Sequence, residues 1–104
     1  MPGPFEVRTE GDALVVFVSG ELDLAVEADL VKYVDEVMQA GDSPGAFALD
    51  LREVSFIDSS GMRALLICQE HANQHQSEMR LRELSVPVRR LLDLAGVMDW
   101  FTVE

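Results

Sequence analysis

The sequence has few of the residues that would cross-link it or let it bind polyanions. Its one cysteine, Cys68, cannot form an internal disulfide, and no set of cysteines or of cysteine–histidine pairs indicates a structural zinc site. The 104 residues include only 8 basic side chains against 19 acidic ones. The resulting net charge of −11 makes direct binding to nucleic acid or to an anionic lipid surface unfavourable.

Signals for export and for membrane insertion are also missing. Met1–Pro4 lacks the basic start and the long apolar stretch of a secretion signal. The longest apolar runs, such as Ala13–Val18, are far shorter than the roughly 20 residues that cross a bilayer. We therefore expect a cytoplasmic protein that works with protein partners, not with nucleic acid or a membrane.

The composition is that of one folded domain. Apolar residues make up 48% of the chain and charged residues 26%, which is too apolar for a disordered protein. A chain of this length buries roughly two-thirds of its surface, enough for a single core. Because no repeat, low-complexity stretch or linker divides the sequence, we expect one domain over residues 1–104.

The first part of the chain predicts a β-hairpin. Apolar and polar residues alternate over Phe5–Thr9, as in a strand with one wet face. A tight turn at Gly11 follows. Ala13–Ser19 is an almost continuous β-branched and aromatic run, which is typical of a strand covered on both faces.

A helix and a third strand are expected next. The pattern breaks after Ser19, and helical periodicity runs from Leu24 to about Ala40, with Asp23 as its N-cap. Glycine, proline and polar residues at 41–45 indicate a turn. Ala46–Leu51 predicts a short strand, and Val54–Ile57 a connection.

The remaining elements complete an alternating pattern. A second helix begins at Asp58 or Ser59 and runs through Ala72, and Met79–Glu83 alternates as a strand. The other expected elements are a helix from Ser85 to Gly96, with Pro87 in its first turn, and a last strand, Trp100–Val103. The order ββαβαβαβ predicts an α/β fold with a mixed sheet of about five strands and helices packed against it.

The candidate functional segment is Asp58-Ser59-Ser60-Gly61, at the start of the second helix. Asp58 can cap the helix, which leaves the serine hydroxyls on its first turn. The free N–H groups and the dipole of a helix N-terminus tolerate an anion there without a lysine. Gly61 has no side chain and would let another surface approach the serines. The alternative interpretation is that these residues only cap a helix.

A serine hydrolase is excluded by geometry. The segment lacks the Gly-x-Ser-x-Gly pattern of a nucleophile elbow. The only histidines, His71 and His75, follow Ser59 by 12 and 16 positions on the same predicted helix. They lie roughly 18 and 24 Å away at ~1.5 Å per residue, whereas a general base must approach within ~3 Å.

A metal site on the same helix is also disfavoured. Cys68, His71 and His75 share one helical stripe, but three ligands on a straight helix make a poor tetrahedron. We expect Cys68 in the core and the histidines at the wet end of the helix.

A phosphoaspartate receiver has little support. Asp50 is predicted to close a strand, but the chain opens with a hairpin where a receiver needs its Mg²⁺-binding acidic pair. No nucleotide-binding glycine motif is present, and no cofactor is expected.

Three segments resemble the STAS domain of bacterial anti-sigma-factor antagonists. Gly20–Asp23 is similar to the family's element after the hairpin. LDLREVSFIDSSGMRALL, residues Leu49–Leu66, is similar to its central strand and phosphorylation-site segment. VPVRRLLDLAGV, residues Val86–Val97, followed by Trp100 and Phe101, is similar to its third helix and last strand. The resemblance covers nearly the whole chain and implies a STAS-like fold.

The resemblance also implies a function. In that family a partner anti-sigma kinase phosphorylates the first serine after the aspartate, which matches Ser59 here. The residues that match the kinase-facing surface are Glu21, Asp23, Asp58, Ser60, Gly61 and Met62. The implied mechanism is partner switching: the unmodified protein binds an anti-sigma factor, which releases its sigma factor. The kinase then phosphorylates the serine with its own ATP, and a phosphatase resets it. The protein itself is then no enzyme but a regulator of transcription, a monomer or a weak dimer.

A second interpretation keeps the same fold. The chain is then a STAS scaffold or sensor module that does not switch through Ser59. The family usually has a further C-terminal helix, whereas this sequence stops at Glu104, either because the helix is absent or because the sequence has been shortened. A partner surface on such a helix is therefore not assumed.

Overall fold

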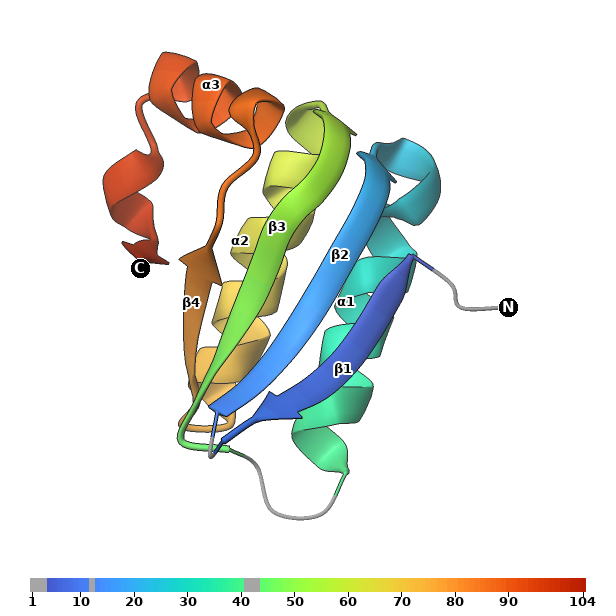
Figure 1. Ribbon diagram of the computed structural model, residues 1–104, viewed down its shortest axis with the longest axis vertical. Coiled ribbons are helices and arrows are strands. Elements are labelled where there is room, and N and C mark those ends of the chain that lie inside the picture. The colour runs from blue at the N-terminus through green and yellow to red at the C-terminus, as the bar shows by residue number, and fades with distance from the viewer. Residues whose placement is uncertain (1–3, 12, 41–43) are drawn as a thin grey trace.

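The computed structural model describes residues 4–11, 13–40 and 44–104, which form one five-stranded sheet with helices against it (Figure 1). The elements in chain order are β1 (Phe5–Glu10), β2 (Ala13–Leu22), α1 (Leu24–Gln39), β3 (Ala46–Ile57), α2 (Ser59–Gln74), β4 (Glu78–Arg82), α3 (Val86–Ala95), the 3₁₀ turn η1 (Met98–Trp100) and β5 (Thr102–Val103). The strands lie in the order β1-β2-β3-β4-β5, with β1 antiparallel to β2 and the other neighbours parallel. The predicted α/β fold with a mixed sheet is confirmed. Residues 12 and 41–43 of the predicted turns lie outside the described ranges.

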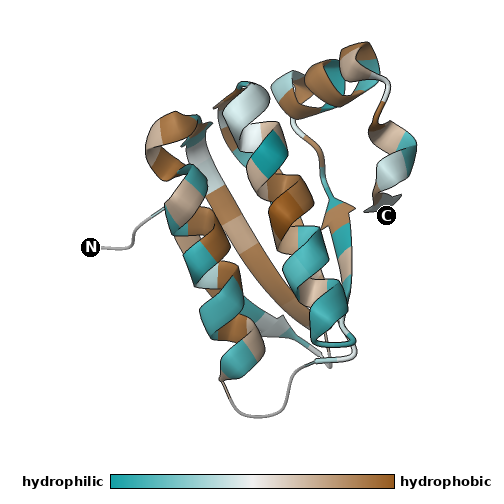
Figure 2. Ribbon diagram, turned by 180° about the vertical axis from the view of Figure 1, so that it is seen from behind, coloured by the Kyte–Doolittle hydropathy of each residue, from teal (hydrophilic) through white to brown (hydrophobic). Residues whose placement is uncertain are grey.

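Helices α1 and α2 cover one face of the sheet and enclose the core. Val16 of β2 and Leu49 of β3 belong to one buried cluster with Leu30 of α1 and Leu65 of α2, and all four are fully buried. Figure 2 views this helical side, where α2 is hydrophobic in its middle and hydrophilic in its last turns. None of the helices in the described ranges is long and apolar enough to span a membrane.

The helix boundaries agree with the sequence because capping residues mark them. Asp23 and Asp58 are the N-caps of α1 and α2, as predicted. Ser85 caps α3, and its side chain accepts a hydrogen bond from the Val88 N–H at 3.5 Å. Gly96 ends that helix in a left-handed conformation with φ 71°.

Both central strands continue past the ends that their sequences predict. The sequence predicts that the second strand ends at Ser19, whereas β2 continues to Leu22. It predicts a connection at Val54–Ile57, whereas β3 includes these residues and ends at Ile57. The register between the strands shifts twice, once before Gly20 and once after it, and each shift places an extra residue on β3. Such bulges remove the period-2 alternation from which a strand is recognised. Gly20 supplies the φ of 85° that the bent strand needs there.

The opposite face of the sheet has no helix over it in the described residues (Figure 1). The prediction that β2 is covered on both faces nevertheless holds at Val15, which alternates with the core residue Val16 and is also fully buried. Phe17 lies on this open face and is half-buried. The guanidinium carbons of Arg8 and Arg82 lie 4.7 and 5.5 Å from the centre of its ring. Two cation–π contacts therefore cover Phe17 where a second layer of helices would otherwise lie.

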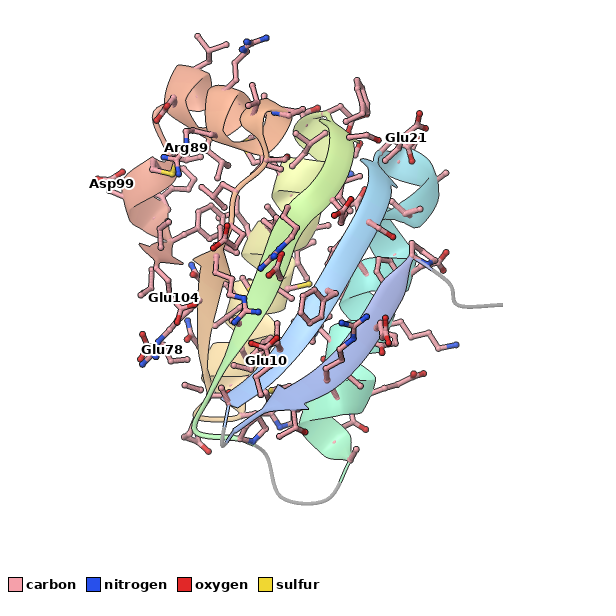
Figure 3. The ribbon with its side chains drawn as sticks, in the orientation of Figure 1. Glu10, Glu21, Glu78, Arg89, Asp99 and Glu104 are labelled. Atoms are coloured by element: carbon pink, nitrogen blue, oxygen red, sulfur yellow. The ribbon has the colours of Figure 1, made fainter. Side chains whose placement is uncertain are left out.

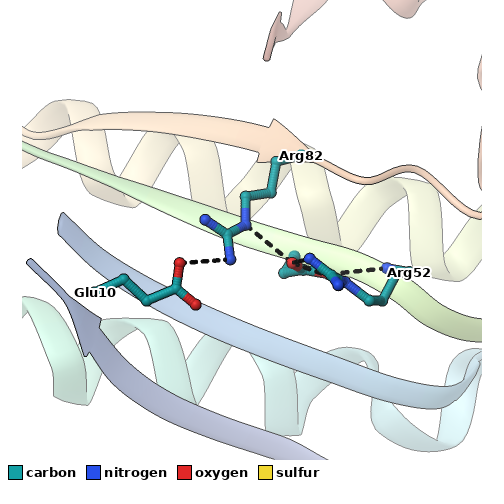
Figure 4. A network of polar contacts seen from close by, with 4 residues as sticks. Glu10, Arg52 and Arg82 are labelled. Atoms are coloured by element: carbon teal, nitrogen blue, oxygen red, sulfur yellow. Dashed lines mark hydrogen bonds and ion pairs between the residues drawn. The ribbon is translucent and has the colours of Figure 1, made fainter.

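A buried carboxylate holds this open face together (Figure 4). Asp50 lies in the middle of β3, not at the end of a strand as predicted, because β3 is longer. It is 1% exposed and accepts hydrogen bonds from Arg52 at 2.8–3.2 Å and from Arg82 at 2.9 Å. Arg82 also pairs with Glu10 of β1 at 3.0 Å. Burial acts to raise the pKa of Asp50, but the bonds from Arg52 and Arg82 outweigh it and leave the pKa lowered.

The C-terminal strand is shorter than predicted. Trp100 belongs to η1 and is 57% exposed, so that β5 consists of Thr102 and Val103 alone. The backbone oxygen of Trp100 accepts a hydrogen bond from the Gln69 side chain of α2 at 2.9 Å. Aromatic and β-branched residues are typical of strands, which is why the sequence predicts a strand from Trp100 onward. In the structure Trp100 instead ends the 3₁₀ turn.

We predict that Asp50→Asn destabilises the fold by about 1–3 kcal/mol near neutral pH, because it leaves Arg52 and Arg82 without their carboxylate. Since the folded pKa is lowered, this contribution is present above the unfolded pKa of about 3.9 and is lost as pH falls below it. Urea unfolding of both proteins across this pH range measures the difference, which should shrink in acid. The exposed Glu78, paired only with Arg80 in the described structure, provides the control Glu78→Gln, with a much smaller effect at every pH.

Candidate functional site

The site lies at the edge of the sheet where the parallel strands β2 and β3 end and α1 and α2 begin (Figure 1). The Asp23 side chain accepts a hydrogen bond from the Ala25 N–H at 3.0 Å. The Asp58 side chain accepts from the Ser60 and Gly61 N–H groups at 2.9 and 3.1 Å. Two capped helix N-termini therefore start side by side, as neighbouring parallel strands require.

The two serines at the start of α2 have different surroundings. Ser59 is the first residue of the helix and is exposed, and its hydroxyl has no hydrogen-bond partner within the described ranges. Ser60 is half-buried, and its N–H serves the Asp58 cap. Of the two serines, Ser59 is therefore the more accessible to a partner protein.

Gly61 is buried, and a glycine is needed there because neighbouring residues of the same domain leave no space for a side chain. A Cβ on Gly61 would overlap the backbone oxygen of Leu22 and would lie 2.8 Å from the Leu22 Cβ and from Ile57 Cγ1. The end of β2 thus packs directly on the first turn of α2, and the Asp58 N–H donates to the Leu22 oxygen at 3.2 Å. This corrects the expectation that the missing side chain leaves room for another surface.

The other predicted residues lie on the same edge. Glu21 is exposed near the upper end of β2, close to the start of α1 (Figure 3). Met62 is half-buried against the core. Two apolar residues that were not predicted from the sequence as site residues also lie here: Leu24 is 69% exposed and Phe56, opposite Glu21 in the sheet register, is 47% exposed. The exposure of Leu24 could have been predicted, because its position in the helical pattern lies off the buried face of α1.

A salt bridge joins the beginnings of the two helices. Arg63 of α2 donates to Glu27 of α1 through Nε at 2.6 Å and through Nη2 at 2.9 Å. The hydrogen bond from Arg63 lowers the pKa of Glu27 against the opposing effect of burial. The sequence gives no signal for this pair, because 36 positions separate the partners.

The residues considered for other chemistry lie elsewhere. Cys68 is fully buried in the core, as predicted, and burial, with a smaller effect of the Asp35 charge, raises the pKa of its thiol to about 12. His71 contacts Asp35 of α1 at 2.6 Å, and His75 is the C-cap of α2, at the opposite end of the helix from Ser59. Within the described part of the chain, no three His, Cys, Asp or Glu side chains are grouped to hold a metal ion.

Known proteins resemble the chain over nearly its whole length. A sequence model of the STAS domain matches residues 4–104. The anti-sigma-B factor antagonist of Listeria monocytogenes is 36% identical over 93 residues, 89% of this chain and 80% of the relative. The anti-sigma F factor antagonist of Paenibacillus polymyxa is 33% identical over 92 residues, 88% and 78% of the two chains. The crystal structure of an anti-sigma factor antagonist from Mycobacterium paratuberculosis matches with a TM-score of 0.75 and 26% identity, covering 95% of this chain and 82% of that one.

We predict that Gly61→Ala destabilises the protein by about 1–3 kcal/mol, because the new methyl group forces β2 and α2 apart. The matched control is Gly45→Ala, where a Cβ meets nothing within 4 Å, and its effect should stay within about 0.5 kcal/mol. Urea unfolding midpoints compare the two variants. Equal stability of both variants would contradict the packing described for Leu22.

Proposed function

The chain belongs to the STAS domain family, and we propose that it acts as an anti-sigma factor antagonist that phosphorylation of Ser59 switches off. The unmodified protein binds an anti-sigma factor, which then releases its sigma factor. The observation that carries the proposal is that Ser59, at the first position of α2, is exposed and that its hydroxyl has no hydrogen-bond partner among the residues the structure describes. A visiting kinase reaches such a hydroxyl without unfolding any part of the domain.

The relatives support the antagonist function. Two of them, at 36% and 33% identity, carry the name of an anti-sigma factor antagonist and match about nine-tenths of this chain. In this proposal the protein has no catalytic activity of its own. Its partners are an anti-sigma factor that is also a serine kinase, and a phosphatase that resets the site. It acts in the cytoplasm as a monomer or a weak dimer, without direct contact to nucleic acid.

The partner surface of the proposal consists of the side chains around the two helix starts. The predicted members Glu21, Asp23 and Asp58 contribute three carboxylates at the end of β2 and at the starts of α1 and α2. The exposed side chains of Leu24 and Phe56 add apolar area, which a binding surface needs at its centre. Gly61 contributes through its packing, because it holds the helix start against Leu22.

The charges of this surface explain how a phosphate would act. Phosphorylation adds about −1.5 to −2 charges beside Asp58 and Asp23. In the free protein, water and the dipole of α2, which is worth ~0.3–1 kcal/mol, accommodate the new charge. In a closed interface the phosphate would lose water and lie among carboxylates. A penalty of a few kcal/mol weakens binding by about 100-fold, so that the switch acts on binding and leaves the fold unchanged.

We predict that incubation with its anti-sigma kinase and ATP adds one phosphate to the protein, as intact-mass spectrometry measures. Ser59→Ala should abolish the addition. Ser60→Ala is the matched control, and it should still be phosphorylated because Ser60 is half-buried and its N–H, which the substitution keeps, serves the cap. A mass that stays unchanged with the kinase would favour the scaffold or sensor interpretation instead.

We also predict that Ser59→Asp weakens binding to the anti-sigma factor, because a carboxylate enters the same crowded position. Isothermal titration should find a loss that approaches the ~100-fold effect of the phosphate. Gln39→Glu adds one negative charge at the other end of α1, where it should leave the affinity unchanged. Binding of Ser59→Asp as tight as that of the unmodified protein would rule out the electrostatic switch.

A further inference from the structure

We propose that Arg63 is the internal counter-ion of a phosphate on Ser59, and that it leaves Glu27 to bind that phosphate. This inference rests on the proposed function, because it concerns the modified form of the same site. In this proposal phosphorylation of α2 changes a side-chain contact between α2 and α1.

Arg63 lies where it can reach a phosphate on Ser59. The two residues are four positions apart on α2, and side chains at this spacing have Cβ atoms about 5–6 Å apart. Helical side chains also lean toward the N-terminus, so an Arg63 side chain that leaves Glu27 can extend toward the turn that begins at Ser59. The Arg63 side chain is 61% exposed, which leaves room for the guanidinium to turn once it leaves Glu27.

The present partner of Arg63 is a single carboxylate. Glu27 receives hydrogen bonds from Nε and Nη2, which leaves the other N–H groups of the guanidinium without a partner in the described structure. The Glu27 side chain is only 14% exposed. The bridge is thus anchored at its α1 end and free to move at its α2 end.

Arg63 is the one arginine or lysine of α2, and the other basic residues of the described ranges belong to other elements. The basic residues outside this site lie on the open face of the sheet, on α3, or farther along α1: Arg8, Arg52, Arg80, Arg82, Arg89, Arg90 and Lys32. The acidic side chains at the two helix starts are Asp23, Asp58 and Glu27, and of these Glu27 pairs with Arg63. A phosphate there would find one guanidinium among several acids.

The charges favour an exchange. A phosphate carries about −1.5 to −2 charges and offers three acceptor oxygens, whereas the Glu27 carboxylate carries one charge. Guanidinium groups bind phosphate bidentately, and the N-terminus of α2 stabilises the anion further. The phosphate also repels Glu27. After the exchange the carboxylate of Glu27 is unpaired, so that the effect of phosphorylation extends from α2 to α1.

The test uses protein with phosphoserine inserted at position 59 during translation, so that no kinase is needed. Carboxyl ¹³C NMR follows the titration of Glu27 in four proteins: unmodified and phosphorylated, each with and without Arg63→Gln. In the unmodified protein Arg63→Gln should raise the pKa of Glu27, because the hydrogen bond that lowers it is lost. In the phosphorylated protein the same substitution should change this pKa little, because Arg63 has already left.

³¹P NMR of the same samples follows the phosphate. Arg63→Gln should raise the proton affinity of the phosphate by about two- to five-fold, because the neighbouring positive charge is lost. Arg63→Lys keeps that charge and should cause a smaller increase. Arg80→Gln is the matched control: it removes an arginine that also pairs with a glutamate, but on the open face, and should change neither signal.

An equal effect of Arg63→Gln on Glu27 in both forms, or an unchanged phosphate titration, would overturn the exchange. Either result leaves Ser59 as a kinase substrate, since the inserted phosphoserine does not depend on a kinase. Conversely, a kinase that fails to modify Ser59 overturns the proposed function and does not alter this measurement.

Discussion

The close packing of Leu22 on Gly61 sets the geometry of the whole site. The end of β2 touches the first turn of α2, and the Asp58 N–H donates to the Leu22 oxygen at 3.2 Å. Since α1 begins two residues after Leu22, this one contact also fixes where α1 starts relative to α2. The exposure of Ser59 and the reach between Arg63 and Glu27 both depend on that placement. A larger residue at position 61 would separate the helix starts and with them the side chains of the site.

The two faces of the sheet are stabilised in different ways. The covered face packs aliphatic side chains under α1 and α2. On the open face, four of the eight basic residues of an acidic chain, Arg8, Arg52, Arg80 and Arg82, lie among carboxylates, and Asp50 is the buried centre of the network. Because each of these arginines has its partner within the same face, the surface offers little unpaired charge to a ligand.

Local features of the sequence predicted the helices well, and long-range contacts explain what it could not predict. The caps Asp23, Asp58 and Ser85 bond to N–H groups within three residues of themselves, so the start of each helix can be predicted from the local sequence. The length of β3 was missed because its bulges depend on pairing with β2, and the role of Gly61 because it depends on Leu22. The Ser59 segment is predicted from its position and its family resemblance, whereas the Arg63–Glu27 bridge becomes visible only when the fold brings α1 and α2 together.

Strand β1 has a consequence for how the molecule behaves in a crowded solution. It lies at an outer edge of the sheet, where unpaired backbone groups can recruit a strand from another molecule. Its outward residues on the open face are Glu6, Arg8 and Glu10, all charged and all exposed. A foreign strand that added to this edge would have to bring its own side chains against these charges. The charges of β1 thereby disfavour edge-to-edge aggregation through this strand.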